Sequence, residues 1–126
     1  MNNERPINLD IATISLPITA IASILHRICA VITWVGLGFY LVVLSQALSS
    51  AEGYMGIEAA LNDNFLMKFF AWGFLSAFGY YCVASLKHII QDFGYFEDFE
   101  GGKMISWASI GIGVILCLLA GVAVWV

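Results

Sequence analysis

The sequence predicts an all-α integral membrane protein with three transmembrane helices. Of its 126 residues, 61% are hydrophobic and 11% are charged, which is far from the composition of soluble globular domains. Three uncharged stretches have the length of a membrane-spanning helix, at residues 28–51, 69–86 and 104–126. A soluble bundle of this size could not bury three helices that are apolar on every side.

The flanking residues extend each apolar stretch into an expected element. We expect one membrane domain, residues 1–126. Residues 1–17 form its N-terminal cytoplasmic arm, and the three spans cover residues of about 20–48, 65–92 and 104–126. The spans are predicted to be helices because backbone that faces lipid must satisfy its own hydrogen bonds. Pro17 is compatible with a helix start, and residues 48–64 form the first connection. The Gly101-Gly102 pair is expected to break the helix before the third span.

The basic residues predict the orientation of the chain. Four of the five lie on one side of the expected spans, namely Arg5, Arg27, Lys87 and Lys103, and Lys68 lies on the other. Short cytoplasmic segments carry the excess of lysine and arginine, so the short N-terminal arm and the connection at residues 93–103 are expected in the cytoplasm. In a bacterial inner membrane the C-terminus would then be periplasmic.

A first set of polar residues opens the first span. Ser23, His26 and Arg27 stand at positions i, i+3 and i+4, which places them on one helical face. A hydroxyl, an imidazole and a guanidinium together can hydrogen-bond a carbonyl oxygen and hold an anionic group. The alternative is that Arg27 only reaches the lipid headgroups as a positive anchor.

A second set forms a stripe along the second span. Tyr81, Ser85, His88 and Asp92 advance by 4, 3 and 4 residues and share one face over about 16 Å. Such a row could ligate a metal, relay protons or bond to a neighbouring helix. Packing accounts well for Tyr81 and Ser85, whereas His88 and Asp92 favour a functional role and are proton-relay candidates. Lys87 is expected to point to the opposite side, toward the lipid headgroups.

Three segments together resemble one known family. They are Arg5-Pro-Ile-Asn-Leu-Asp, the stretch PITAIASILHR ending at Arg27, and the stretch SLKHIIQDFG beginning at Ser85. Their order and spacing are similar to those of the cytochrome b556 membrane-anchor subunits of succinate dehydrogenase (complex II). The resemblance implies that the three spans form half of a bundle shared with a second small anchor subunit. It also implies that the pair carries an iron–sulfur subunit and a flavoprotein subunit.

The resemblance assigns roles to the first polar set. Residues that match Ser23 and Arg27 belong to the ubiquinone site in the family, and the histidine that matches His26 lies near the haem propionates. The family's haem b is held by one histidine from each anchor. In this subunit that histidine opens the pattern H-x-x-x-G-[IL]-[RK]-H.

The chain departs from the family at the haem ligand. The pattern reads Tyr81-Cys-Val-Ala-Ser85-Leu-Lys-His88, so a tyrosine occupies the axial-ligand position. Ser85 and His88 are expected in the vicinity of the haem, and Tyr81 could ligate the iron as a phenolate. Otherwise the iron is bound by the second anchor's histidine alone, or haem is missing. We expect haem b to be retained and shared with the second anchor.

The expected function is that of the membrane anchor of succinate:quinone oxidoreductase, with quinone reduced at the cytoplasmic end of the bundle. The chain is expected to act only as a subunit, because it has no flavin motif, no cluster cysteines and no dicarboxylate site. No signature of nucleic-acid binding is present. Two alternatives are the anchor of a fumarate reductase, which uses menaquinone, and a non-redox helical membrane protein whose polar residues only hold helices together.

Overall fold

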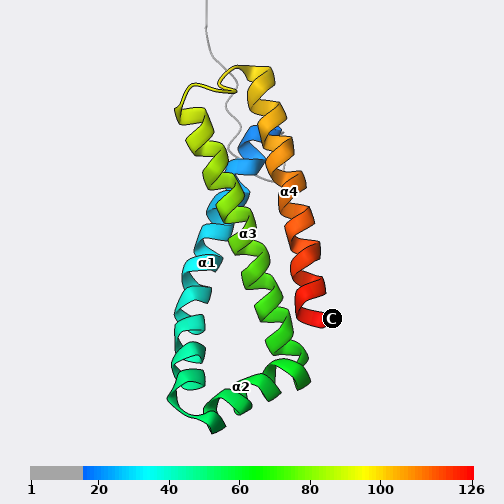
Figure 1. The fold of residues 1–126 in the computed structure, drawn as a ribbon. Coiled ribbons are helices and arrows are strands. Elements are labelled where there is room, and N and C mark those ends of the chain that lie inside the picture. Colours follow the sequence, from blue (N-terminus) through cyan, green and yellow to red (C-terminus); the bar gives the residue numbers. More distant parts are fainter. Residues whose placement is uncertain (1–15) are drawn as a thin grey trace, which may run out of the picture.

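The computed structural model describes residues 16–126, which form four α-helices (Figure 1). They are α1 (Ile18–Ser49), α2 (Ala51–Asp63), α3 (Phe65–Asp92) and α4 (Phe99–Trp125). Helices α1, α3 and α4 are each long and apolar enough to cross a membrane. The structure therefore confirms an all-α membrane protein with three spans. Most of the predicted N-terminal arm, residues 1–15, lies outside the described residues.

The expectation that Gly101-Gly102 interrupts the chain before the third span is wrong. Helix α4 begins at Phe99, after Asp98 in extended conformation, and the Gly102 amide donates to the Asp98 carbonyl at 2.8 Å. The place where a Cβ on Gly102 would stand is 3.7 Å from the methyl group of Thr19 in α1. Packing against α1 thus offsets the low helix propensity of the glycines.

The first connection also contains more structure than the sequence indicated. Thirteen of its residues form α2, which begins after Ser50. The Ser50 hydroxyl caps this helix by accepting a hydrogen bond from the Gly53 amide at 2.9 Å. Asn64 then caps α3 by accepting from the Leu66 amide at 2.9 Å. Two caps in succession produce the sharp change of direction at each end of α2 (Figure 1).

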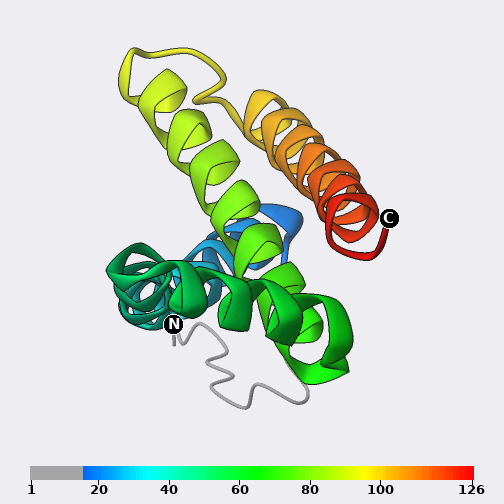
Figure 2. The ribbon, with the colours of Figure 1, turned by 60° about the horizontal axis from the view of Figure 1, so that its bottom comes forward.

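Helix α3 is the central element and packs against both α1 and α4. Near its start α1 passes across α3, and it diverges from α3 toward α2 (Figures 1 and 2). We call the region where α1 starts, α3 ends and α4 starts the crossing end, and the opposite region the α2 end.

Small buried residues allow the three helices to approach closely at the crossing end. Ala22 and Ala84 are each 1% exposed, and Ser106 is completely buried. The Tyr80 hydroxyl donates to the Ala22 carbonyl at 2.8 Å and so joins α3 to α1. The Tyr80 ring also lies against α4, 2.6 Å from where a Cβ on Gly113 would stand, so any side chain there would displace it.

The α2 end is held mainly by aromatic side chains. The Trp72 indole donates to the Cys117 carbonyl at 2.9 Å and links α3 to α4. The Trp125 ring centroid lies 6.0 Å from that of Trp72 and 6.2 Å from that of Phe65. Aromatic rings of this kind concentrate where a membrane meets water.

Candidate functional site

The two polar sets predicted from the sequence meet between α1 and α3 at the crossing end. His26 of α1 lies against three of the four stripe residues of α3. Its Nε2 is 3.2 Å from the Ser85 hydroxyl oxygen. Its ring is stacked on Tyr81, with the centroids 5.1 Å apart and the planes at 17°. The His88 ring is also 5.1 Å away, tilted by 46°. We call these four residues the histidine cluster.

The hydrogen bonds within the histidine cluster favour one tautomer of a neutral His26. The Ser85 hydroxyl donates its single proton to the Tyr81 carbonyl, one helical turn back, at 2.7 Å. The oxygen of Ser85 is then the acceptor toward His26 in the tautomer that carries its proton on Nε2. The second nitrogen of His26, Nδ1, is then the basic one and can accept a proton or a hydrogen bond.

Ser23 and Arg27 lie on α1 beside the histidine cluster. Ser23 stands one turn before His26 and is half-buried, whereas Arg27 follows His26 and is exposed. Because His26 is held by α3, the helical face that carries Ser23 and Arg27 has a fixed rotation relative to α3. This end of the molecule therefore presents a hydroxyl and a guanidinium beside a pair of imidazoles.

Asp92 is the one stripe residue that does not join the histidine cluster. It is the last residue of α3 and is exposed. His88 stands one turn before it, half-buried. The stripe therefore leads from an exposed carboxylate at the end of α3 to the imidazole pair at the crossing, in steps of about 6 Å per helical turn along the α3 face.

The expectation that Lys87 extends toward the lipid headgroups is wrong. Its side chain is only 5% exposed. Tyr80 packs on Gly113 and Trp72 contacts Gly121, so α3 and α4 run antiparallel and Lys87 is level with the start of α4. The buried face of α3 that carries Lys87 also carries Tyr80, which contacts both α1 and α4. The sequence did not reveal that helices pack on this face.

Two patterns in the sequence could have revealed this packing. Ala77, Tyr80, Ala84 and Lys87 are the buried residues of α3, and their spacing of 3, 4 and 3 marks one face. The buried residues of α4 are all small and recur by 4, 3 and 4, at Gly102, Ser106, Ser109 and Gly113. A stripe of small residues is typical of an interface between membrane helices.

The histidine cluster lacks the composition of a self-contained metal centre. Among residues 16–126, no three His, Cys, Asp or Glu side chains lie close enough together to hold a metal ion. The three cysteines carry free thiols. A metal ion at this end would therefore need further ligands from another molecule.

Comparison with known proteins agrees with the assignment of a transmembrane protein. Residues 1–120 match the profile of the family described as the succinate dehydrogenase/fumarate reductase transmembrane subunit. The fold and the site define a multi-pass helical membrane subunit, and the chain belongs to this family.

Two curated relatives are similar over almost the whole chain. The succinate dehydrogenase cytochrome b556 subunit of Coxiella burnetii is 31% identical over 125 residues, which cover 99% of this chain and 100% of the relative. The succinate dehydrogenase cytochrome b560 subunit of Reclinomonas americana is 30% identical over 125 residues, covering 95% of this chain and 86% of the relative. The resemblance inferred from the motifs is thereby confirmed.

Proposed function

We propose that this chain is the membrane anchor of a succinate:quinone oxidoreductase and forms part of its quinone-reduction site at the crossing end. The observation that carries this proposal is the docking of His26 between Tyr81, Ser85 and His88. It holds Ser23 and Arg27 in fixed positions on the adjoining face of α1. Both relatives are succinate dehydrogenase subunits by name, which favours succinate oxidation over the fumarate reductase alternative.

The proposed role of Ser23 and Arg27 is to bind the quinone and to stabilise the charge that forms on it. The Ser23 hydroxyl donates a hydrogen bond to one quinone carbonyl. The Arg27 guanidinium stabilises the negative charge that develops on an oxygen as electrons arrive. An exposed arginine beside a half-buried serine suits a ligand that enters from the bilayer with its polar ring at the membrane edge.

Quinone reduction also consumes protons, and the α3 stripe offers a route for them. Asp92 takes up a proton at the exposed end of α3 and passes it to His88. The His88 ring is 5.1 Å from that of His26, a separation that one water molecule or a small rotation bridges. His26 stands one helical turn from Ser23 on the same face of α1 and passes the proton on. The quinone oxygen is the final acceptor of the proton.

The relatives are cytochromes b by name, and the histidine cluster is compatible with haem b shared between two chains. His26 has its Nε2 directed toward Ser85. The residues of this chain that would hold the haem iron are Tyr81 or His88, with the second ligand from the other anchor. When bound, the haem supplies a one-electron carrier.

The identity of that ligand is tested by the visible spectrum of the purified complex. With Tyr81 as the ligand, or with the iron bound only from the second anchor, we expect a high-spin or broadened spectrum. Tyr81→His should then give sharp bands of low-spin, bis-histidine iron on reduction, whereas Tyr81→Phe separates phenolate ligation from packing. A clean bis-histidine spectrum of the wild-type complex would assign the ligand to His88 instead.

The quinone site is tested by two substitutions and two assays. We expect Ser23→Ala and Arg27→Leu each to reduce succinate:quinone reductase activity by about 10²- to 10³-fold, the effect of removing one donor to a developing oxyanion. Succinate oxidation with a soluble dye should persist, because the dye accepts electrons before the anchor. Ser45→Ala, on the same helix, and Lys103→Leu are the matched controls and should retain both activities. Loss of both activities together would show that Ser23 and Arg27 are structural.

The proposal includes the partners of the chain. A second small anchor, an iron–sulfur subunit and a flavoprotein subunit complete the complex, the last two on the cytoplasmic side of a bacterial inner membrane. Many large apolar side chains of α1, α3 and α4 are exposed in the single chain and suit contact with lipid and with the second anchor. Purification in a four-subunit complex supports this assembly, whereas recovery of a stable single chain in detergent would contradict it.

A further inference from the structure

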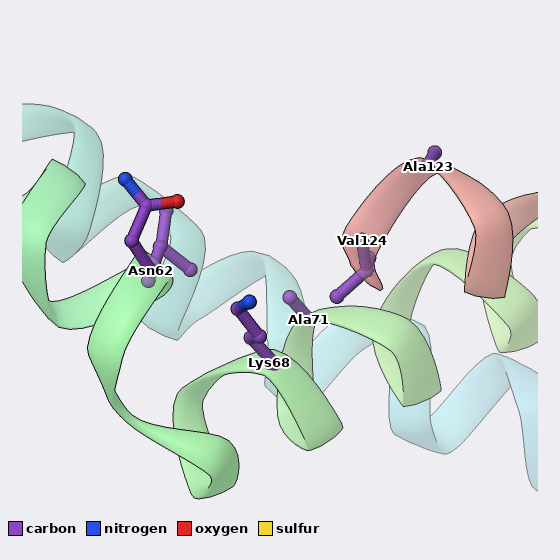
Figure 3. Close-up of a pocket in the computed structure, with 6 residues that line it drawn as sticks. Asn62, Lys68, Ala71, Ala123 and Val124 are labelled. Atoms are coloured by element: carbon purple, nitrogen blue, oxygen red, sulfur yellow. The ribbon is translucent and has the colours of Figure 1, made fainter. Parts of the chain in front are cut away.

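A second polar feature lies at the α2 end, far along the bundle from the histidine cluster. Helices α2, α3 and α4 surround a hollow of about 270 Å³ (Figure 3). The residues that line it are Leu61, Asn62, Lys68, Ala71, Ala123 and Val124. In Figure 3 the Lys68 side chain lies between Asn62 of α2 and Val124 of α4. The proposed quinone reaction uses none of these residues.

The aromatic residues around the hollow mark its depth in the membrane. Trp72 follows Ala71, and Trp125 follows Val124, and their rings lie 6.0 Å apart. Tryptophans are enriched at the level of the lipid headgroups. The hollow therefore opens where headgroups and the first part of the acyl chains are found. The small side chains of Ala71 and Ala123 leave room between α3 and α4 for an acyl chain.

The charges around the hollow are of both signs. Among residues 49–126, Lys68 is the one basic residue at the α2 end, because Lys87 stands near the end of α3 and Lys103 near the start of α4. It stands in the first turn of α3, where the amide groups and the helix dipole also favour a negative group. On α2, Asp63 directly follows the lining residue Asn62. Together with the C-terminal carbonyls of α4, its carboxylate favours a positive group.

We propose that this hollow binds one zwitterionic aminophospholipid, of the phosphatidylethanolamine type, from the leaflet at the α2 end. The phosphate binds the Lys68 ammonium and the Asn62 amide group. The lipid ammonium faces the Asp63 carboxylate and the carbonyl end of α4. One acyl chain runs along Ala71 and Ala123. A lipid of net negative charge would match Lys68 alone and would be repelled by Asp63.

The test is native mass spectrometry of the complex that contains this chain, released from nanodiscs of mixed phosphatidylethanolamine and phosphatidylglycerol. The wild-type complex should retain phosphatidylethanolamine in preference to phosphatidylglycerol. Lys68→Met should lower this retention about tenfold, the equivalent of one charge-assisted hydrogen bond. Ala71→Leu should lower it comparably without changing a charge, because the added side chain fills the acyl-chain path. Lys103→Met removes a lysine at the other end and is the control.

Three results would overturn the proposal. The first is equal lipid retention by the wild-type complex and Lys68→Met. The second is a preference for phosphatidylglycerol, which would remove the assignment of a zwitterionic headgroup. The third is loss of another subunit from the Lys68→Met and Ala71→Leu complexes with lipid retention unchanged, which would make the hollow a protein contact. Quinone reductase activity of these variants is measured separately, so the quinone proposal can fail or stand independently.

Discussion

The two ends of the bundle are built from different residues and are held together by different kinds of packing. At the crossing end, alanine, glycine and serine let three helices approach closely, and the polar side chains of α1 and α3 bond to each other across the contact. At the α2 end, bulky aromatic rings pack between the helices, and a hollow with one lysine remains beside them. Close backbone approach holds polar groups in defined positions, whereas aromatic packing fixes the depth of the chain in the membrane.

This comparison explains why the candidate chemistry lies at one end. A polar group inside a membrane is costly unless another group satisfies it. The crossing provides such groups, because His26 and Ser85 lie within hydrogen-bond distance and Tyr80 donates to a backbone carbonyl of α1. Once the helices are fixed there, Ser23 and Arg27 on the same helix keep a constant relation to α3.

The largest expected difference between the two ends is in their labelling from each side of the membrane, because we expect them to face opposite sides. Cysteine introduced at Gly56 in α2 should react with an impermeant thiol reagent from the periplasm. Cysteine at Glu97, in the connection before α4, should react only from the cytoplasm. The positive-inside distribution of lysine and arginine is the physical reason. Both variants are made in a background without the native cysteines, and the reverse labelling pattern would refute the orientation.

The next effect concerns the close packing of the crossing. Ala84→Leu inserts three carbon atoms where the side chain is 1% exposed, and overpacking of this kind costs about 1–3 kcal/mol. We expect a clear fall in the thermal stability of the purified complex. Ala108→Leu, on an exposed face of α4, is the matched control and should change stability little. Equal tolerance of the two substitutions would show that the crossing is loosely packed.

A smaller effect is expected from a single hydroxyl at the crossing. Tyr80→Phe keeps the ring but removes the hydrogen bond to the Ala22 carbonyl, a net loss of about 0.5–1.5 kcal/mol. Tyr81→Phe, one residue further on, removes a hydroxyl that has no hydrogen bond to a described residue and should cost less. Thermal unfolding of the two variants in the same detergent makes the comparison. If Tyr81→Phe were the more destabilising, the assignment of Tyr80 as the linking residue would be wrong.

The smallest effect is expected at the α2 end. Trp72→Phe also removes one hydrogen bond to a backbone carbonyl, that of Cys117. The indole is only part-buried, so water and headgroups can replace the bond, and we expect a loss below about 0.5 kcal/mol. Unfolding under the same conditions as for Tyr80→Phe provides the measurement. A greater loss for Trp72→Phe would reverse the ranking of the two ends.

Much of this architecture could be predicted from the sequence, but not the element boundaries around glycine and serine. Charge-free length identified three spans, and the second one matches α3 at residues 65–92. The start of α4 was missed because Gly101 and Gly102 disfavour a helix locally, whereas the approach of Gly102 to Thr19 of α1 is a contact between distant segments. Helix α2 was missed because its caps are weak signals in a short polar segment.

What the sequence determined by itself was the set of residues that share a face within one helix. Helical periodicity places Ser23, His26 and Arg27 together on α1, and it places Tyr81, Ser85 and His88 together on α3, whatever the helices pack against. Only the tertiary structure decided that these two faces meet, that Lys87 is buried, and that a hollow remains beside Lys68. The physical reason is that periodicity is a local property of the backbone. The pairing of faces depends on how small and large side chains from distant segments fit together.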